Sequence, residues 1–138
     1  DRRYIAAAMG VPVYEVSKDF AFSAAHQIRM HGGKCERLHG HNWTIRIHAR
    51  ATELNAIGMV LDFADLQAIV ADLCARFDHR NVNEIPPFTD ENTTAELLAR
   101  YFYTEAGRRL AASERGRVTV SRVEVWENPG SLAVYREE

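Results

Sequence analysis

Two segments with a two-residue apolar alternation restrict the fold more than any other feature of the chain, and each carries histidine at one end. In the second segment, Trp43 and Ile45 share one parity, and His39 and His41 continue it toward the N-terminus. Successive side chains of a β-strand point to opposite faces, so these four residues share one face. The pattern predicts a strand from His41 to about Glu53 with histidines at its N-terminal end.

The first segment shows the same alternation and ends in a third histidine. One parity is apolar and runs into His26, whereas the other parity holds polar residues such as Glu15 and Ser17. This pattern predicts a strand over Val13–Ala25. The apolar members are Tyr14, Val16, Phe20, Phe22 and Ala24. Three histidines are therefore expected at the rim of one buried face.

Three half-buried imidazoles would repel one another if charged, and a shared divalent metal is the simplest partner for three neutral rings. Zinc is the first candidate. Three histidine ligands leave a fourth tetrahedral position for water or substrate, which is the catalytic arrangement. The alternative is that His39-Gly40-His41 is only a polar turn and that His26 is a satisfied core histidine. The parity shared by the two strands favours the metal.

The rest of the chain predicts two helices followed by two strands. Asp62 is a suitable N-cap for an amphipathic helix that ends near Phe77. Thr93–Glu96 fits a capping box at the start of a second helix that ends near Ala112. A strand over Val118–Asn128 changes apolar parity, which predicts a bulge near Ser121, and a last short strand covers Leu132–Tyr135. The order is ββααββ, an α+β fold with two helices on one face of a four-stranded antiparallel sheet.

Length and charge narrow the class of protein. A chain of 138 residues predicts one domain, here residues 13–138, preceded by a loose arm over residues 1–12. The formal net charge of -2 gives no electrostatic footprint for nucleic acid or for an anionic membrane. No apolar run approaches the roughly 20 residues that span a bilayer, so a cytoplasmic protein is expected.

The two cysteines do not form a disulfide framework and are expected to differ in reactivity. Cys74 falls on the apolar pattern of the first helix and is expected in the core. Cys35 lies in a loop with Lys34 and Arg37, where positive charge favours the thiolate, and it comes four residues before His39.

Asp78 and His79 follow each other where the first helix ends. The carboxylate could fix the tautomer of the imidazole and raise its basicity, which suits a proton-transfer pair. The alternative is a histidine that merely stabilises a helix C-terminus.

Glu127 shares parity with Val123 and Val125, which places a carboxylate at the end of an apolar face. A buried carboxylate needs donors, and a flat heterocycle with adjacent N–H groups would supply two. The alternative is an edge glutamate that is half in water. His31 and His48 are expected on the surface.

Several motifs together resemble the 6-pyruvoyl-tetrahydropterin synthase family over roughly Tyr14 to Tyr135. They are FSAAH, CERLHGHN, GMVLDFADL, FDHRNVN, a TTAE helix start and a late Trp-Glu-Asn. Three residues separate Cys35 from the HGH motif, which is similar to the bacterial 6-carboxy-tetrahydropterin synthases of the queuosine pathway.

The resemblance implies a fold, an assembly and a set of site residues. The fold would be the tunnelling fold (T-fold), in which subunits join their sheets into a barrel and two trimers stack as a homohexamer with sites between subunits. The implied site residues are the zinc ligands His26, His39 and His41, the general base Cys35, the proton relay Asp78 and His79, and the pterin contacts Glu127, Thr93 and Thr94.

The implied reaction converts 7,8-dihydroneopterin triphosphate to 6-carboxy-5,6,7,8-tetrahydropterin, triphosphate and acetaldehyde. The nearest alternative is the biopterin-type enzyme, which eliminates triphosphate and keeps a pyruvoyl side chain. A non-catalytic protein that binds pterin or zinc is a further alternative. Lys34, Arg37 and Arg80 are candidates to hold the triphosphate, although each also fits a solvated charged loop.

Overall fold

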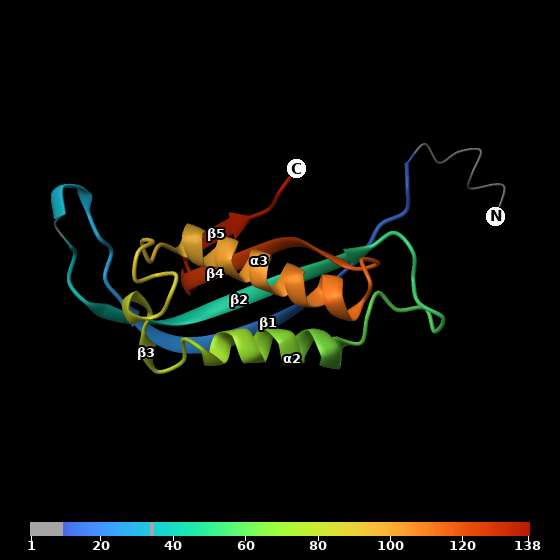
Figure 1. The fold of residues 1–138 in the computed structure, drawn as a ribbon, viewed down its shortest axis with the longest axis horizontal. Helices are drawn as coiled ribbons and strands as arrows, with labels where there is room; N and C mark the ends of the chain where they lie inside the picture. Colours follow the sequence, from blue (N-terminus) through green and yellow to red (C-terminus); the bar gives the residue numbers. More distant parts are fainter. Residues whose placement is uncertain (1–9, 34) are drawn as a thin grey trace.

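A computed structural model describes residues 10–33 and 35–138 of the chain. Five strands form one mixed sheet in the order β3-β1-β2-β4-β5 (Figure 1). In chain order they are β1 (Tyr14–His26), β2 (His39–Ala51), β3 (Arg80–Asn81), β4 (Thr119–Asn128) and β5 (Ser131–Tyr135). The four long strands pair antiparallel, and the apolar alternation predicted them to within about two residues at most ends.

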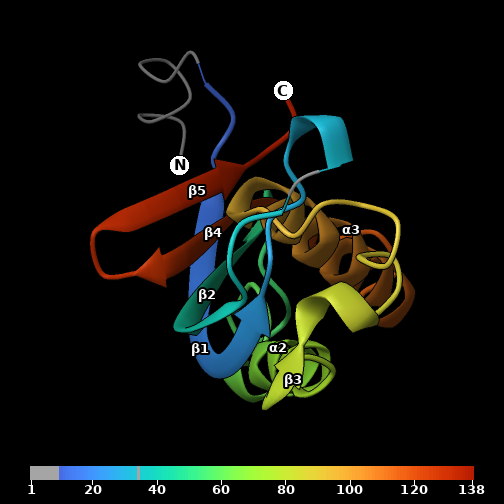
Figure 2. The ribbon, with the colours of Figure 1, turned by 90° about the vertical axis from the view of Figure 1, so that its left-hand side faces the viewer.

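Two helices cover one face of this sheet, as the sequence predicted. They are α2 (Phe63–Ala75) and α3 (Ala95–Ser113), and both lie on the same side of the strands in Figure 2. Short 3₁₀ turns occur at η1 (His31–Gly33) and η2 (Val82–Glu84). None of the helices within the described ranges is long and apolar enough to cross a membrane.

The core lies between the helices and the apolar face of the sheet. Trp43, Ile45 and Ile47 of β2 are fully buried. The ring of Phe22 stacks on Trp43 at a centroid distance of 6.2 Å and meets Phe77 at 5.8 Å. The end of α2 is therefore fixed to the part of the sheet that leads to the histidines.

The predicted sheet lacked one strand. After α2, the chain passes through His79, which has a φ of 59°, and Arg80 and Asn81 then pair with Ala24 and Ala25. This pairing is parallel, so the sheet is mixed and five-stranded rather than antiparallel and four-stranded. Two residues are too few to show an alternation, so the sequence pattern carried no sign of β3.

The caps and the bulge test the finer predictions. The side chain of Asp62 accepts a hydrogen bond from the Ala64 amide, which confirms it as the N-cap of α2. The N-cap of α3 is Thr94, not Thr93, because the Thr93 hydroxyl donates to the Gln27 carbonyl instead. His48 pairs with Arg122 and Ala49 pairs with Val120, so the bulge at Ser121 is confirmed.

The expectation that His48 lies on the surface is wrong. Its side chain is buried, and Nε2 forms a short hydrogen bond with Glu124 Oε1. Glu15 Oε1 lies 3.8 Å from Nδ1 on the other side of the ring. Long polar side chains on neighbouring strands therefore cover a residue on the polar face. The side chain of His31 lies outside the described part of the structure.

Replacing Phe77 by alanine is expected to destabilise the protein by about 3–5 kcal/mol, because a fully buried ring is lost and a cavity remains. Urea unfolding followed by circular dichroism measures the loss. Phe63→Ala is the matched control: that ring is 49% exposed, so its loss should cost about 1 kcal/mol. Equal losses for the two variants would contradict the assigned core.

Candidate metal centre and active site

The three histidines predicted as ligands meet where β1 ends and β2 begins. Antiparallel register places His26 directly opposite His39, and His41 opposite Ala24. One nitrogen from each ring can be chosen so that the three atoms lie within 4.8 Å of one another. His26 is buried, whereas His39 and His41 are half-buried. The cluster therefore has a closed side within the core and a side that faces outward.

Backbone carbonyls fix the tautomers of two of the rings. His26 Nδ1 lies 2.7 Å from the Thr93 oxygen, and His39 Nδ1 lies 2.8 Å from the Arg37 oxygen. A carbonyl oxygen can only accept, so both Nδ1 atoms carry hydrogen and donate. In the neutral rings, both Nε2 atoms then present lone pairs, and they face each other at 3.1 Å.

Two facing lone pairs repel unless a cation or a shared proton lies between them. Burial lowers the pKa of His26, and the nearby rings of His39 and His41 lower it further, against the opposing effects of the Thr93 carbonyl and the Glu127 carboxylate. The protonated form of His26 is thus disfavoured at neutral pH. A metal cation placed between the two nitrogens would remove this repulsion.

The cluster fits zinc in distance and in donor type. Two nitrogens about 2.05 Å from a tetrahedral Zn²⁺ lie about 3.3 Å apart, close to the separation of the two Nε2 atoms. His41 Nε2 is buried without a hydrogen-bond partner among the described residues, as expected of an atom that needs a ligand. Three neutral imidazoles with an open side are the donor set of catalytic zinc.

The predicted proton-transfer pair is held at the end of α2. Asp78 Oδ2 lies 3.0 Å from His79 Nδ1, and Asp78 Oδ1 accepts from the Ser23 amide at 3.0 Å. The Ser23 amide, together with His79, holds the pKa of Asp78 below its usual value. The carboxylate fixes the Nδ1–H tautomer of His79, which leaves Nε2 free to exchange a proton.

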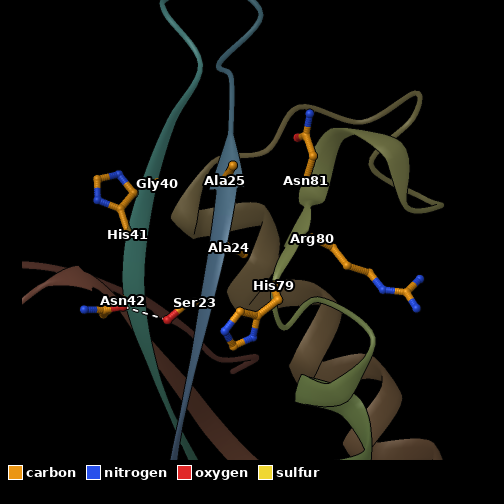
Figure 3. A pocket seen from close by; sticks show the side chains of 9 residues that line it. All are labelled: Ser23, Ala24, Ala25, Gly40, His41, Asn42, His79, Arg80 and Asn81. Carbon is orange, nitrogen blue, oxygen red and sulfur yellow. Dashed lines mark hydrogen bonds between the residues drawn. The ribbon is translucent and has the colours of Figure 1, made fainter.

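A surface pocket is lined both by His79 and by residues of the two strands that carry the predicted metal ligands. It has a volume of about 470 Å³, and His41, Asn42, Ser23 and His79 are among its lining residues. Figure 3 shows the ring of His79 projecting beside Ser23, whose hydroxyl donates to Asn42 at 2.7 Å. Cys35 is not among the residues that line this pocket.

Cys35 is exposed in the long loop between β1 and β2. The loop projects beyond the sheet in Figure 1, and an isolated bridge pairs Cys35 with Arg29. Of the triphosphate candidates, Arg37 and Arg80 are exposed, and Lys34 lies outside the described residues. The arm over residues 1–12 is described only from Gly10 onward.

Glu127 reaches both the histidines and a second pocket. Its Oε1 lies 4.0 Å from His26 Nε2, and its side chain lines a pocket of about 270 Å³ with Glu96 of α3. Trp126 pairs with Leu132 and Asn128 with Ser131, so Glu127 sits at an irregularity of β4. Alternation with the buried Val123 and Val125 points its carboxylate toward the same face, at the end of the core.

The hydroxyls of the two predicted threonine contacts already have partners. That of Thr93 is buried and donates to the Gln27 carbonyl, and that of Thr94 accepts from the Leu97 amide. Their contact with pterin stays a prediction. The sequence patterns did not single out the Thr93 carbonyl as the partner of His26, because a main-chain atom leaves no residue signature.

Residues 15–138 match the family described as 6-pyruvoyl tetrahydropterin synthase. The chain belongs to this family. Its likeness to the solved 6-pyruvoyl tetrahydropterin synthase of Caenorhabditis elegans has a TM-score of 0.77 at 23% identity, over 95% of this chain and 100% of that one. This likeness in fold supports the predicted tunnelling fold.

Curated relatives carry two different names. The 6-carboxy-5,6,7,8-tetrahydropterin synthase of Bacillus subtilis is 33% identical over 89% of this chain and 85% of its own length. The enzyme of the same name from Haemophilus influenzae is 30% identical over 91% of this chain and 100% of its own length. The 6-pyruvoyl tetrahydrobiopterin synthase of Drosophila melanogaster is 30% identical over 91% and 80%. The prediction of an enzyme of this family is confirmed.

The two cysteines should react differently with iodoacetamide at neutral pH. Burial raises the pKa of Cys74 to about 12, with a smaller effect from Asp78, so its thiolate is scarce and inaccessible. Cys35 is exposed and should be alkylated first. Peptide mass spectrometry after a short incubation measures both sites, and in urea both should react. Similar rates in the folded protein would contradict these assignments.

Proposed function

We propose that this chain is a zinc-dependent lyase that converts 7,8-dihydroneopterin triphosphate and one water to 6-carboxy-5,6,7,8-tetrahydropterin, triphosphate and acetaldehyde, a step of queuosine biosynthesis. The observation that carries the proposal is the pair of Nε2 atoms from His26 and His39, which face each other at 3.1 Å in a chain of this family. The names of the bacterial relatives and the three-residue spacing from Cys35 to His39 support this product over others.

His26, His39 and His41 hold the zinc in this proposal. Bound zinc supplies Lewis acidity for negative charge that develops on the side chain of the substrate. The Thr93 and Arg37 carbonyls keep the rings of His26 and His39 oriented with Nε2 toward the ion. The ligand positions thus follow from the backbone at the ends of β1 and β2.

Proton transfer is assigned to Cys35 and His79. Cys35 takes a proton from a side-chain carbon, and His79 returns one through Nε2 while Asp78 holds Nδ1–H. Two trimers stack as a homohexamer in this proposal, and His79 then serves a site whose Cys35 belongs to another subunit. Separate positions of the two groups in one chain are compatible with that assembly.

Glu127 anchors the pterin ring in this proposal. A carboxylate accepts well from two adjacent N–H groups of a heterocycle. Glu127 lines the pocket with Glu96, and its carboxylate lies 4.0 Å from His26, so a ring held by this carboxylate would lie near the histidines. Arg37 and Arg80 are candidates for contact with the triphosphate.

The first test is to identify the product. The zinc-loaded protein is incubated with 7,8-dihydroneopterin triphosphate, and mass spectrometry identifies the pterin while a coupled assay detects acetaldehyde. A carboxy-pterin with acetaldehyde is expected, because the two outer carbons of the side chain leave together. Cys35→Ala should keep its zinc and lose turnover. No turnover by the metal-replete protein would overturn the proposal.

The alternative product is a pyruvoyl-pterin that keeps all three side-chain carbons. The fly relative is as similar to this chain as the Haemophilus enzyme, at 30% identity, so the alternative has direct support. A pyruvoyl-pterin without acetaldehyde would assign the chain to that reaction.

Glu127→Gln is expected to weaken binding of dihydroneopterin about ten-fold or more, because hydrogen bonds to a charged acceptor are replaced by weaker ones. Fluorescence titration measures the affinity, and urea unfolding checks that stability is kept. Glu96 lines the same pocket, so Glu96→Gln is the matched control. Weaker binding in the control alone would move the anchor role to Glu96.

A further inference from the structure

Two asparagine side chains bind the segment that follows His26 at the end of β1. Asn83 Oδ1 accepts from the Gln27 amide at 2.8 Å, and Asn83 Nδ2 donates to the Gln27 carbonyl at 2.8 Å. Asn92 repeats the arrangement two residues further, with 2.9 Å to the Arg29 amide and 2.8 Å to the Arg29 carbonyl. We call these four hydrogen bonds the amide clamp.

The amide clamp replaces a missing neighbour strand. β3 pairs with β1 only at Ala24 and Ala25, and the chain then turns into η2. A side-chain amide carries one acceptor and donors, as a peptide group does, so each asparagine can satisfy both main-chain groups of its partner. Gln27 and Arg29 are two residues apart, as are the residues of a strand that bond the same neighbour. The strand-like hydrogen bonding of β1 therefore continues past His26.

The clamp holds both ends of the bond that orients His26. Gln27 follows His26 directly, and Asn92 precedes Thr93, whose carbonyl accepts from His26 Nδ1. The Thr93 amide donates to Asn92 Oδ1 at 3.0 Å, and the Thr93 hydroxyl donates to the Gln27 carbonyl. A shift of either asparagine therefore moves the ring or its acceptor.

The guanidinium of Arg29 strengthens the same connection. Nη1 donates to the Glu91 carbonyl at 2.6 Å, and Nη2 donates to the Phe88 carbonyl at 2.8 Å. The connection between α2 and α3 is thus tied to the start of the Cys35 loop by side chains from both partners.

We infer that Asn83 and Asn92 are positioning residues that keep His26 Nε2 aimed at the metal. The inference rests on the proposed metal centre. Partners that orient a ligand histidine set its tautomer and ring orientation, and their loss typically weakens metal binding about 10–100-fold. Asn92 lies nearest in sequence to the acceptor of His26, so its loss should have the larger effect.

The test measures zinc affinity by competition with a chromophoric chelator, and geometry by the absorption spectrum of the Co²⁺ form. Asn92→Ala should weaken zinc binding about ten-fold or more and change the Co²⁺ spectrum, at a temperature where the variant is folded. Asn92→Asp keeps the acceptor and loses the donor to Arg29, so an intermediate loss is expected. Asn55→Ala is the matched control, because Asn55 also accepts from two loop amides, those of Ile57 and Met59.

A double-mutant comparison separates positioning from general stability. If Asn92 acts through His26, Asn92→Ala should leave zinc affinity unchanged in a His26→Ala background. Unchanged affinity of Asn92→Ala in the wild-type background would overturn the inference, as would an equal loss in both backgrounds. A wild-type protein that binds no zinc would instead refute the proposed metal centre.

Discussion

The site depends on one electrostatic constraint, the lone pairs of His26 and His39 that face each other across 3.1 Å. Each ring is turned this way because its other nitrogen donates to a backbone carbonyl. Neither ring can relieve the repulsion without losing that bond, and burial opposes protonation of His26. Strand register therefore decides where the nitrogens of the proposed metal centre meet.

β1 is the element on which the parts of the site converge. Its last residue, His26, is a proposed metal ligand, its Ser23 amide binds Asp78, and its neighbour β2 supplies the other two histidines. The α2–α3 connection adds the Thr93 carbonyl and two asparagines to the same strand end. The paired end of β1, rather than the long loop that follows it, therefore sets the relative positions of the histidines and Asp78.

Much of the fold and of the histidine cluster was predictable from the sequence, because apolar periodicity shows which face of a strand is buried. Alternation predicted β1, β2 and the meeting of His26, His39 and His41, and the capping signal predicted Asp62. Strand β3 was missed because a strand of two residues shows no alternation. His48 was misassigned because parity cannot show that neighbouring polar side chains cover a residue. The roles of Asn83 and Asn92 depend on main-chain partners far along the sequence, which no local pattern reveals.

The bulge at Ser121 brings Val118 and Val120, before it, and Val123 and Val125, after it, to the same buried face. One additional residue corrects the phase of the strand between its two halves. Substituting Ser121 changes one side chain, whereas deleting it would turn half of the strand inside out and present two buried valines to water. At this point, natural variation should preserve the number of residues far more strictly than their identity.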